Sequence, residues 1–136
     1  MIGRSLLVVA LLGAAPVPAL AQQPQFTPSD AYRQCMMQPD AARGIATATD
    51  LCLGLEQTVQ LDRLGQAYQR AFDALTGWDQ VRLHNDQAEW RAGLDDRCAE
   101  AARQDPRNAT DSRAFNICRT EEIAARAAIL DRENAE

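Results

Sequence analysis

The side chains that could carry out catalysis are few and poorly placed for it. His84 is the only histidine, and its polar neighbours predict a solvated helix face rather than a general base. The adjacent acidic pairs Asp95/Asp96 and Glu121/Glu122 could suggest a glycosidase. Consecutive helical side chains point about 100° apart, however, so these pairs predict solvated faces. The chain also lacks a glycine-rich phosphate loop, HExxH and GxSxG. We therefore predict no catalytic residues and no cofactor, and hence not an enzyme.

Four cysteines, Cys35, Cys52, Cys98 and Cys118, are the other chemically distinctive residues. A zinc site or a thioredoxin-like site needs closely spaced cysteines, and no two lie near each other here, so we predict no metal. An even number in a small exported chain predicts two disulfides. Three pairings are possible, and the sequence alone does not choose among them. We favour Cys35 with Cys52 and Cys98 with Cys118, because each pair closes a loop as short as a helix, a turn and the start of the next helix.

The first 21 residues resemble a secretory signal peptide. A basic residue, Arg4, precedes an apolar run from Leu6 to Ala15, and Ala19 and Ala21 predict cleavage after Ala21. The apolar run is shorter than the ~20 residues that span a bilayer. No lipoprotein cysteine follows the cleavage point, so we expect no membrane anchor after cleavage. These features predict a periplasmic or secreted protein, with residues 22–27 as a polar leader.

The mature chain would be the size of one domain, which we place at residues 28–133. All 14 basic residues are arginine, and without Arg4 the remaining 13 face 19 acidic residues, a net charge of −6. This charge disfavours nucleic-acid binding, which needs a basic face. A cationic partner would be attracted instead.

Helical periodicity runs through this domain, and no stretch alternates as a strand does. We expect a short helix over 28–37, capped by Thr27 with Pro28 in its first turn, and then a connector with one helical turn. Long helices are expected over about 50–75, over 79–104, and from a cap at Asp111 or Ser112 to about residue 130. The fold class is therefore all-α: a small antiparallel helical bundle of one short and three long helices, stapled by two disulfides.

Each long helix has one predicted core stripe. For the second helix the stripe is Leu61, Leu64, Tyr68, Ala71 or Phe72, and Leu75. The third has Leu83, Gln87, Trp90, Leu94, Cys98 and Ala101, and the fourth has Phe115, Cys118, Glu122, Ala125 and Ile129, flanked by Ile117, Ile123 and Leu130. Glu122 and Arg126 are spaced for an i,i+4 ion pair. Trp78, beside a turn at Gly77, could be a partner-facing anchor, but we expect it to cover the end of the core. The outward residues Glu89, Arg91 and 95–97 are candidates for a partner-contacting surface.

With these elements in place, the chain resembles the lysozyme-inhibitor LprI family of small exported bacterial proteins. The resemblance extends from about Cys35 to Leu130, through YRQC, LCL, LDRLGQAYQRAFDAL, QAEWRAGLDDRC and ICRTEEIAARAAIL. Its most specific positions include Tyr68, Gln87, Trp90 and Arg126, which we take as core or family-motif residues. The resemblance implies an exported helical domain with disulfides, and the family's namesake is a lipoprotein that inhibits lysozyme. This chain lacks the lipoprotein cysteine.

These observations predict an exported soluble binding protein that inhibits a lysozyme-type muramidase by surface docking. The acidic charge would speed its encounter with a cationic lysozyme-type partner. The alternative is a structural or interaction module of the envelope with a different partner. The sequence specifies neither the partner-binding residues nor the oligomeric state.

Overall fold

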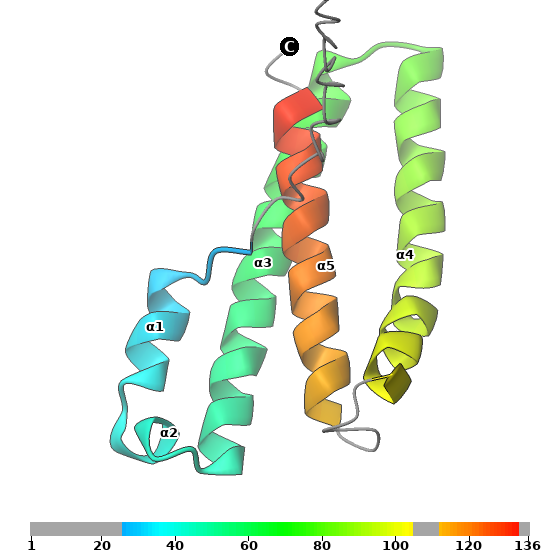
Figure 1. Cartoon of the computed structure of the whole chain (residues 1–136). Helices are drawn as coiled ribbons and strands as arrows, with labels where there is room; N and C mark the ends of the chain where they lie inside the picture. Colours follow the sequence, from blue (N-terminus) through cyan, green and yellow to red (C-terminus); the bar gives the residue numbers. More distant parts are fainter. Residues whose placement is uncertain (1–25, 105–111, 134–136) are drawn as a thin grey trace, which may run out of the picture.

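A computed structural model of the protein describes residues 26–104 and 112–133. The expected signal peptide, its cleavage site and the candidate cap Asp111 lie outside these residues. The described chain forms five helices and no strand: α1 (Asp30–Met36), α2 (Pro39–Ala42), α3 (Ala46–Ala74), α4 (Trp78–Gln104) and α5 (Ser112–Glu133) (Figure 1). The all-α class and the three long helices are confirmed. The connector's single helical turn is α2, and it lets α3 begin four residues before the expected Asp50.

The three long helices run up, down and up (Figure 1). Consecutive helices are antiparallel, as predicted, which makes α3 and α5 parallel to each other. Ion pairs between α3 and α5 at both ends agree with this parallel arrangement. Near the N-termini of the two helices, Arg113 Nε lies 2.9 Å from Asp50 Oδ1, and near their C-termini Arg70 Nη2 lies 2.7 Å from Asp131 Oδ1. The left-handed conformation at Gly77, φ 58°, lets α3 turn tightly into α4.

Both predicted disulfides are present. Cys35 bonds Cys52 with an S–S distance of 1.95 Å, and Cys98 bonds Cys118 with an S–S distance of 1.98 Å. The first ties α1 to the N-terminal half of α3, and the second ties the C-terminal half of α4 to the start of α5. Two such bonds in a domain of this size fit an oxidising compartment.

The core lies where the three long helices meet. Its buried members are Leu64, Ala67, Ala71, Leu94, Cys98, Ile123, Ala127 and Leu130, with Tyr68, Leu83, Trp90, Phe115 and Cys118 packed at its edge. Several buried positions are alanines, which let the helix backbones approach closely and leave little apolar area to bury. The disulfides therefore add stability that a core this small needs.

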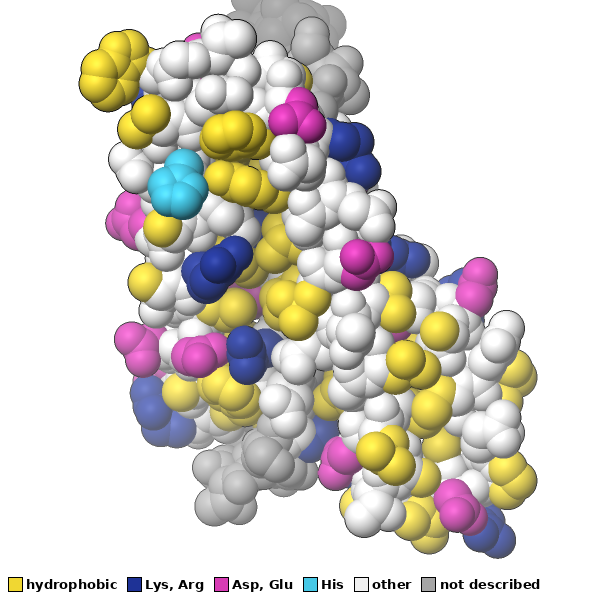
Figure 2. All heavy atoms as spheres, turned by 180° about the vertical axis from the view of Figure 1, so that it is seen from behind, with side chains coloured by type: hydrophobic (Ala, Val, Ile, Leu, Met, Phe, Trp, Pro, Cys, Tyr) yellow, Lys and Arg dark blue, Asp and Glu magenta, His cyan; other side chains and the backbone are white. Residues whose placement is uncertain are grey.

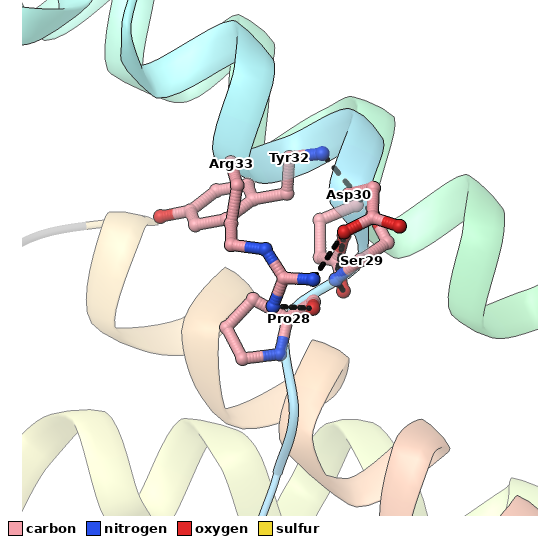
Figure 3. Close-up of polar contacts among 6 residues, drawn as sticks. Pro28, Ser29, Asp30, Tyr32 and Arg33 are labelled. Atoms are coloured by element: carbon pink, nitrogen blue, oxygen red, sulfur yellow. Dashed lines mark hydrogen bonds and ion pairs between the residues drawn. The ribbon is translucent and has the colours of Figure 1, made fainter.

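The start of α1 differs from the prediction. Ser29, not Thr27, is the N-cap, and its hydroxyl accepts a hydrogen bond from the Tyr32 amide at 3.1 Å (Figure 3). Pro28 precedes the cap, and its carbonyl accepts a hydrogen bond from Arg33 Nη1 at 3.0 Å. Glu56 of α3 accepts hydrogen bonds from the Ser29 amide, at 3.0 Å to Oε1, and from the Ser29 hydroxyl. Because this carboxylate selects Ser29 as its partner, the helix begins at Asp30, two residues later than expected.

The buried face of α3 is rotated from the predicted stripe. Leu64 and Ala71 are buried as expected, but Leu61 is 50% exposed. The buried face also includes two polar residues that the pattern did not flag, Glu56 and Gln60, which hydrogen-bond each other with Gln60 Nε2 2.6 Å from Glu56 Oε1. The predicted stripe followed the leucines because apolar spacing cannot identify core positions that are occupied by polar residues.

The predicted stripes of α4 and α5 are correct in part. Gln87, Leu94 and Cys98 are buried, whereas Ala101 is exposed. On α5 the fully buried face is Thr120, Ile123, Ala127 and Leu130, so two residues expected beside the stripe are at its centre. The stripe that we predicted for α5, with Cys118, Ala125 and Ile129, is only half-buried and forms one wall of a groove.

Apolar side chains are also exposed on the opposite side of the molecule from that in Figure 1. Figure 2 shows them gathered over the region of α1, α2 and the N-terminal part of α3. The exposed residues of this region are Met37, Ile45, Leu51 and Leu55, with Leu51 75% exposed. No helix of the described chain is long and apolar enough to cross a membrane.

Candidate binding groove between α4 and α5

Three of the four motif residues meet at the interface of α4 and α5. Gln87, only 5% exposed, accepts a hydrogen bond at its Oε1 from Arg126 Nε at 2.9 Å. The Arg126 guanidinium carbon lies 5.9 Å from the centre of the Trp90 ring, within cation–π range. Gln87 and Trp90 are three residues apart on α4 and so share a face, which is why a single arginine of α5 reaches both.

Tyr68, the fourth motif residue, lies elsewhere. It is half-buried on α3, where its ring lies 6.0 Å from that of Phe72 and its hydroxyl 3.4 Å from His84 Nδ1. This contact joins α3 to the start of α4. Tyr68 therefore belongs to the packing of the bundle and not to the groove.

Beside the Gln87–Arg126 contact, α4 and α5 enclose a groove of about 560 Å³. Its lining residues are Phe26, Trp90, Arg97, Cys118, Glu121, Glu122, Ala125, Arg126 and Ile129. The volume lies in the range of about 300–1,000 Å³ that is typical of ligand sites. Phe26 reaches the groove from the segment before α1, so three parts of the chain contribute to it. We call it the α4/α5 groove.

Arg97 spans one wall of the α4/α5 groove. Its Nη2 donates a hydrogen bond to the Trp90 carbonyl at 3.3 Å and lies 3.4 Å from Glu122 Oε2. Gly93 allows this position, because a Cβ there would lie 2.7 Å from Arg97 Nη1. Within the described chain, Glu122 forms its ion pair with Arg97 and none with Arg126. The expected i,i+4 pair is therefore wrong, because Arg126 turns instead toward the buried Gln87.

The acidic side of the α4/α5 groove has one perturbed carboxyl. Partial burial, and secondarily the charge of the adjacent Glu122, raises the pKa of Glu121 above its ordinary value. Glu121 is exposed, as predicted for the Glu121/Glu122 pair, whereas Glu122 is half-buried. The two side chains diverge along the helix, as consecutive helical residues do. Nothing in this arrangement resembles the facing carboxylates of a glycosidase.

A second, smaller groove lies between α3 and α5. It has a volume of about 370 Å³ and is lined by Thr27, Gln60, Arg63, Gln66, Arg70, Ala124, Ala125, Ala127, Ala128 and Asp131. The Arg70–Asp131 ion pair spans it. Arg70 and Asp131 neutralise each other across it, and Arg63 is its remaining charged residue. With the smaller volume and without an aromatic wall, it is a weaker candidate for a ligand site than the α4/α5 groove.

The prediction for Trp78, at the turn between α3 and α4, is wrong. Trp78 does not cover the end of the core: it is 82% exposed. Val81, one helical turn later, is 45% exposed. A large aromatic side chain gains no burial from folding while it faces water, so this position suits an anchor for a partner.

The other sequence candidates lie apart from both grooves. His84 is exposed, as expected for a solvated face. Asp95 and Asp96 are exposed, and Asp95 Oδ1 lies 3.2 Å from Arg119 Nε. Across residues 26–104 and 112–133, no three His, Cys, Asp or Glu side chains gather as metal ligands.

Sequence reasoning missed the groove residue Phe26, and it named Arg97 as a surface candidate without placing it in a groove. Phe26 falls in the leader, which has no helical pattern to place it. Arg97 appeared only among outward residues, although the Gly93–Arg97 spacing of one helical turn was a signal that the arginine could fold back over the helix.

Comparison with protein-family models, with curated proteins and with solved structures gives no match for this chain.

Proposed function

We propose that this protein is an exported binding protein that inhibits a lysozyme-type muramidase by docking on its surface. The proposal combines the resemblance to the LprI family, the signal-like first 21 residues and the net charge of −6 expected after their removal. The two disulfides are consistent with export to the periplasm or beyond. For a cationic lysozyme, the opposite charges would speed the encounter in a salt-dependent way.

The exposure of Trp78 is the observation that carries the proposal. The α3–α4 turn lies at one end of the bundle (Figure 1) and exposes Trp78 and, one helical turn later, Val81. An exposed apolar side chain at the end of a bundle can enter a concave enzyme cleft, and tryptophan is among the residues most often found at the energetic centre of protein interfaces. We therefore place the docking surface at this end of the bundle, the Trp78 tip.

The test is a titration of purified, disulfide-bonded protein against c-type and g-type lysozymes, measured by lysis of cell walls. We expect stoichiometric inhibition of at least one lysozyme, weakened by salt. Trp78→Ala should reduce the affinity at least tenfold without changing the melting temperature, because an interface anchor contributes about 2 kcal/mol or more. The matched control is Leu51→Ala, which truncates an apolar side chain of similar exposure, 75% against 82%, near the other end of α3 and should leave inhibition intact. Undiminished lysis at excess protein would refute the proposal.

The second candidate is an envelope structural or interaction module. It is favoured by the exposed leucines of α3, of which Leu51 and Leu55 lie in the N-terminal half of the helix and Trp78 follows its C-terminal end. A pull-down from envelope extract in which Leu51→Ala, and not Trp78→Ala, loses a specific partner would support this candidate, provided that lysozymes stay unbound.

A further inference from the structure

We propose that the α4/α5 groove is a ligand site for an apolar molecule that ends in a carboxylate, with Arg126 as the residue that pairs with the carboxylate. This inference does not depend on the proposed function, because the groove and the Trp78 tip are formed by different residues. A binding protein can carry both sites.

Arg126 is held in place by residues of α4. It is half-buried, its Nε donates a hydrogen bond to the buried Gln87, and its guanidinium carbon lies 5.9 Å from the centre of the Trp90 ring. Within the described residues this one hydrogen bond is all that it makes, so Nη1 and Nη2 keep their donors available along the edge opposite Gln87. A guanidinium with two free parallel donors and a fixed plane matches the two oxygens of a carboxylate. Its rotational freedom is already restricted, so a ligand loses less entropy by pairing with it.

The remaining walls select the body of the ligand. Phe26, Ala125, Ile129, the Trp90 ring and the Cys98–Cys118 disulfide provide an apolar surface beside the arginine. An alkyl chain or an apolar side chain of a few carbons fits a groove of about 560 Å³ and would cover these surfaces. The groove therefore combines one directional polar group with apolar walls, as small-molecule sites commonly do.

The acidic residues do not reverse this preference. The charge of Glu122 is matched by Arg97 at 3.4 Å. Glu121 lies at the rim, where its exposed part faces water and its partial burial disfavours the charged form. Arg126 is the charged group that lies farther in, against Trp90 and Gln87. A ligand whose chain fills the groove would place its charged end beside this arginine, so the groove should bind acids better than amines of the same length.

The experiment is a fluorescence titration of the disulfide-bonded protein carrying Trp78→Phe, so that Trp90 is the only tryptophan. The probes are octanoate, octanol and octylamine. Two peptides with the same apolar sequence, one with a free C-terminal carboxylate and one amidated, test whether the carboxylate can come from a peptide chain end. We expect saturable binding of octanoate, at least tenfold tighter than octanol or octylamine. Binding of the free-acid peptide would make a peptide terminus the source, and binding of octanoate alone would make it a small acid.

Two variants assign the carboxylate to Arg126. Arg126→Gln keeps a donor for Gln87 but removes the charge, and should weaken octanoate binding at least tenfold while octanol binding stays unchanged. Arg126→Lys, which keeps the charge but loses the paired donors, should fall between. The matched control Arg132→Gln, an exposed arginine later on α5 and outside the groove, should bind octanoate normally. Equal binding of octanoate and octanol, no saturable octanoate binding, or unchanged affinity in Arg126→Gln would each overturn the proposal.

Discussion

Glu56 of α3 and Ser29 at the start of α1 are joined by hydrogen bonds from both the amide and the hydroxyl of the serine to one carboxylate. Glu56 is 1% exposed, and Gln60 donates to it as well. A fully buried carboxylate is tolerated only when its oxygens accept hydrogen bonds, and these three donors meet that need. The contact fixes the position of the short N-terminal helix on the bundle.

Glu56→Ala should therefore destabilise the protein by about 2–3 kcal/mol, because hydrogen bonds to a charged group are lost and the donors of Ser29 and Gln60 are left buried. Glu56→Gln keeps one acceptor and should cost less. Urea unfolding under oxidising conditions measures both. The matched control is Glu89→Ala, an exposed glutamate on α4, which should change the free energy of unfolding by less than about 0.5 kcal/mol. Equal effects of Glu56→Ala and Glu89→Ala would contradict the role given to the buried carboxylate.

This contact also shows the limit of sequence reasoning for the fold. The apolar spacing of the three long helices was enough to predict the class and the helix order. The even cysteine count left three pairings open, and the short loop between Cys35 and Cys52 favoured the pairing that the structure has. The cap at Ser29 could not be predicted, because it depends on Glu56, 27 residues away. The same holds for Arg126: its spacing from Glu122 suggested a local ion pair, but a buried amide on another helix is the stronger partner.

The Trp78 tip and the α4/α5 groove show the same limit for the site. A tryptophan beside a glycine turn is compatible with a core lid or with an exposed anchor, and only the path of α4 away from the turn decides between them. The groove arises because the α5 stripe of Cys118, Ala125 and Ile129 is not fully covered by α4. Amphipathic spacing indicates which face is apolar but not how closely the next helix approaches.

The Cys35–Cys52 disulfide should stabilise α1 and α2 more than the three long helices. Replacing both cysteines by serine removes the covalent link between α1 and α3, a loop closure that contributes about 3 kcal/mol in the chain-entropy model. We expect amide exchange to accelerate first in α1 and α2, while the amides of α3 to α5 stay protected, because the core cluster is formed by the three long helices. Replacing Cys98 and Cys118 by serine is the comparison, and it should expose α4 and α5 instead. Identical exchange patterns in the two double variants would show that the molecule unfolds as one unit.

Gly93→Ala should displace Arg97 in the α4/α5 groove without lowering the stability of the protein. Alanine in a helix interior favours the helix by about 1 kcal/mol relative to glycine. Its methyl group would meet Arg97 Nη1, so the arginine must move away from Glu122. That exposed pair contributes at most about 1 kcal/mol, so stability should rise or stay level. Thermal melting measures the first effect. In the Trp78→Phe background, where Trp90 is the only tryptophan, a changed fluorescence maximum would report the displaced Arg97. Gly65→Ala, at an open position of α3, is the control: it should raise the melting temperature and leave the fluorescence unchanged.

Glu121 and Glu100 should contribute to the pH dependence of stability with opposite signs. The pKa of Glu121 is raised in the folded protein, so the folded state binds its proton more tightly than the unfolded state does. The resulting stability is present below about pH 4.5 and is lost as the pH rises through the raised value. Glu121→Gln should therefore stabilise the protein relative to the parent at pH 7 more than at pH 4.

Glu100 gives the opposite case. Hydrogen bonds from Arg103 and then Gln104, with the charge of Arg103, lower the pKa of this exposed carboxyl. Its contribution is present above about pH 4.5 and is lost as the pH falls through the lowered value. Glu100→Gln should thus be less stable than the parent at pH 7, with the difference shrinking in acid. Melting temperatures of the parent and the two variants from pH 3 to 8 measure both slopes, and slopes of the same sign would contradict the assignment.

The contact between Gln87 and Arg126 can be measured as a coupling energy. Arg126→Met leaves the Gln87 carbonyl buried without a donor, which costs about 1–3 kcal/mol. Gln87→Leu should cost less, because the half-buried Arg126 can turn its Nε toward water. In the double variant neither polar group is left unpaired, so its loss of stability should be smaller than the sum of the single losses by about 1 kcal/mol.

The matched control cycle combines Gln87→Leu with Arg132→Met. Arg132 lies near the end of α5 and does not contact Gln87, so the two losses of stability should add within about 0.5 kcal/mol. If the Arg126 cycle is also additive, the two side chains are neighbours without energetic coupling, and the fixed orientation of the guanidinium in the α4/α5 groove has to come from Trp90 alone.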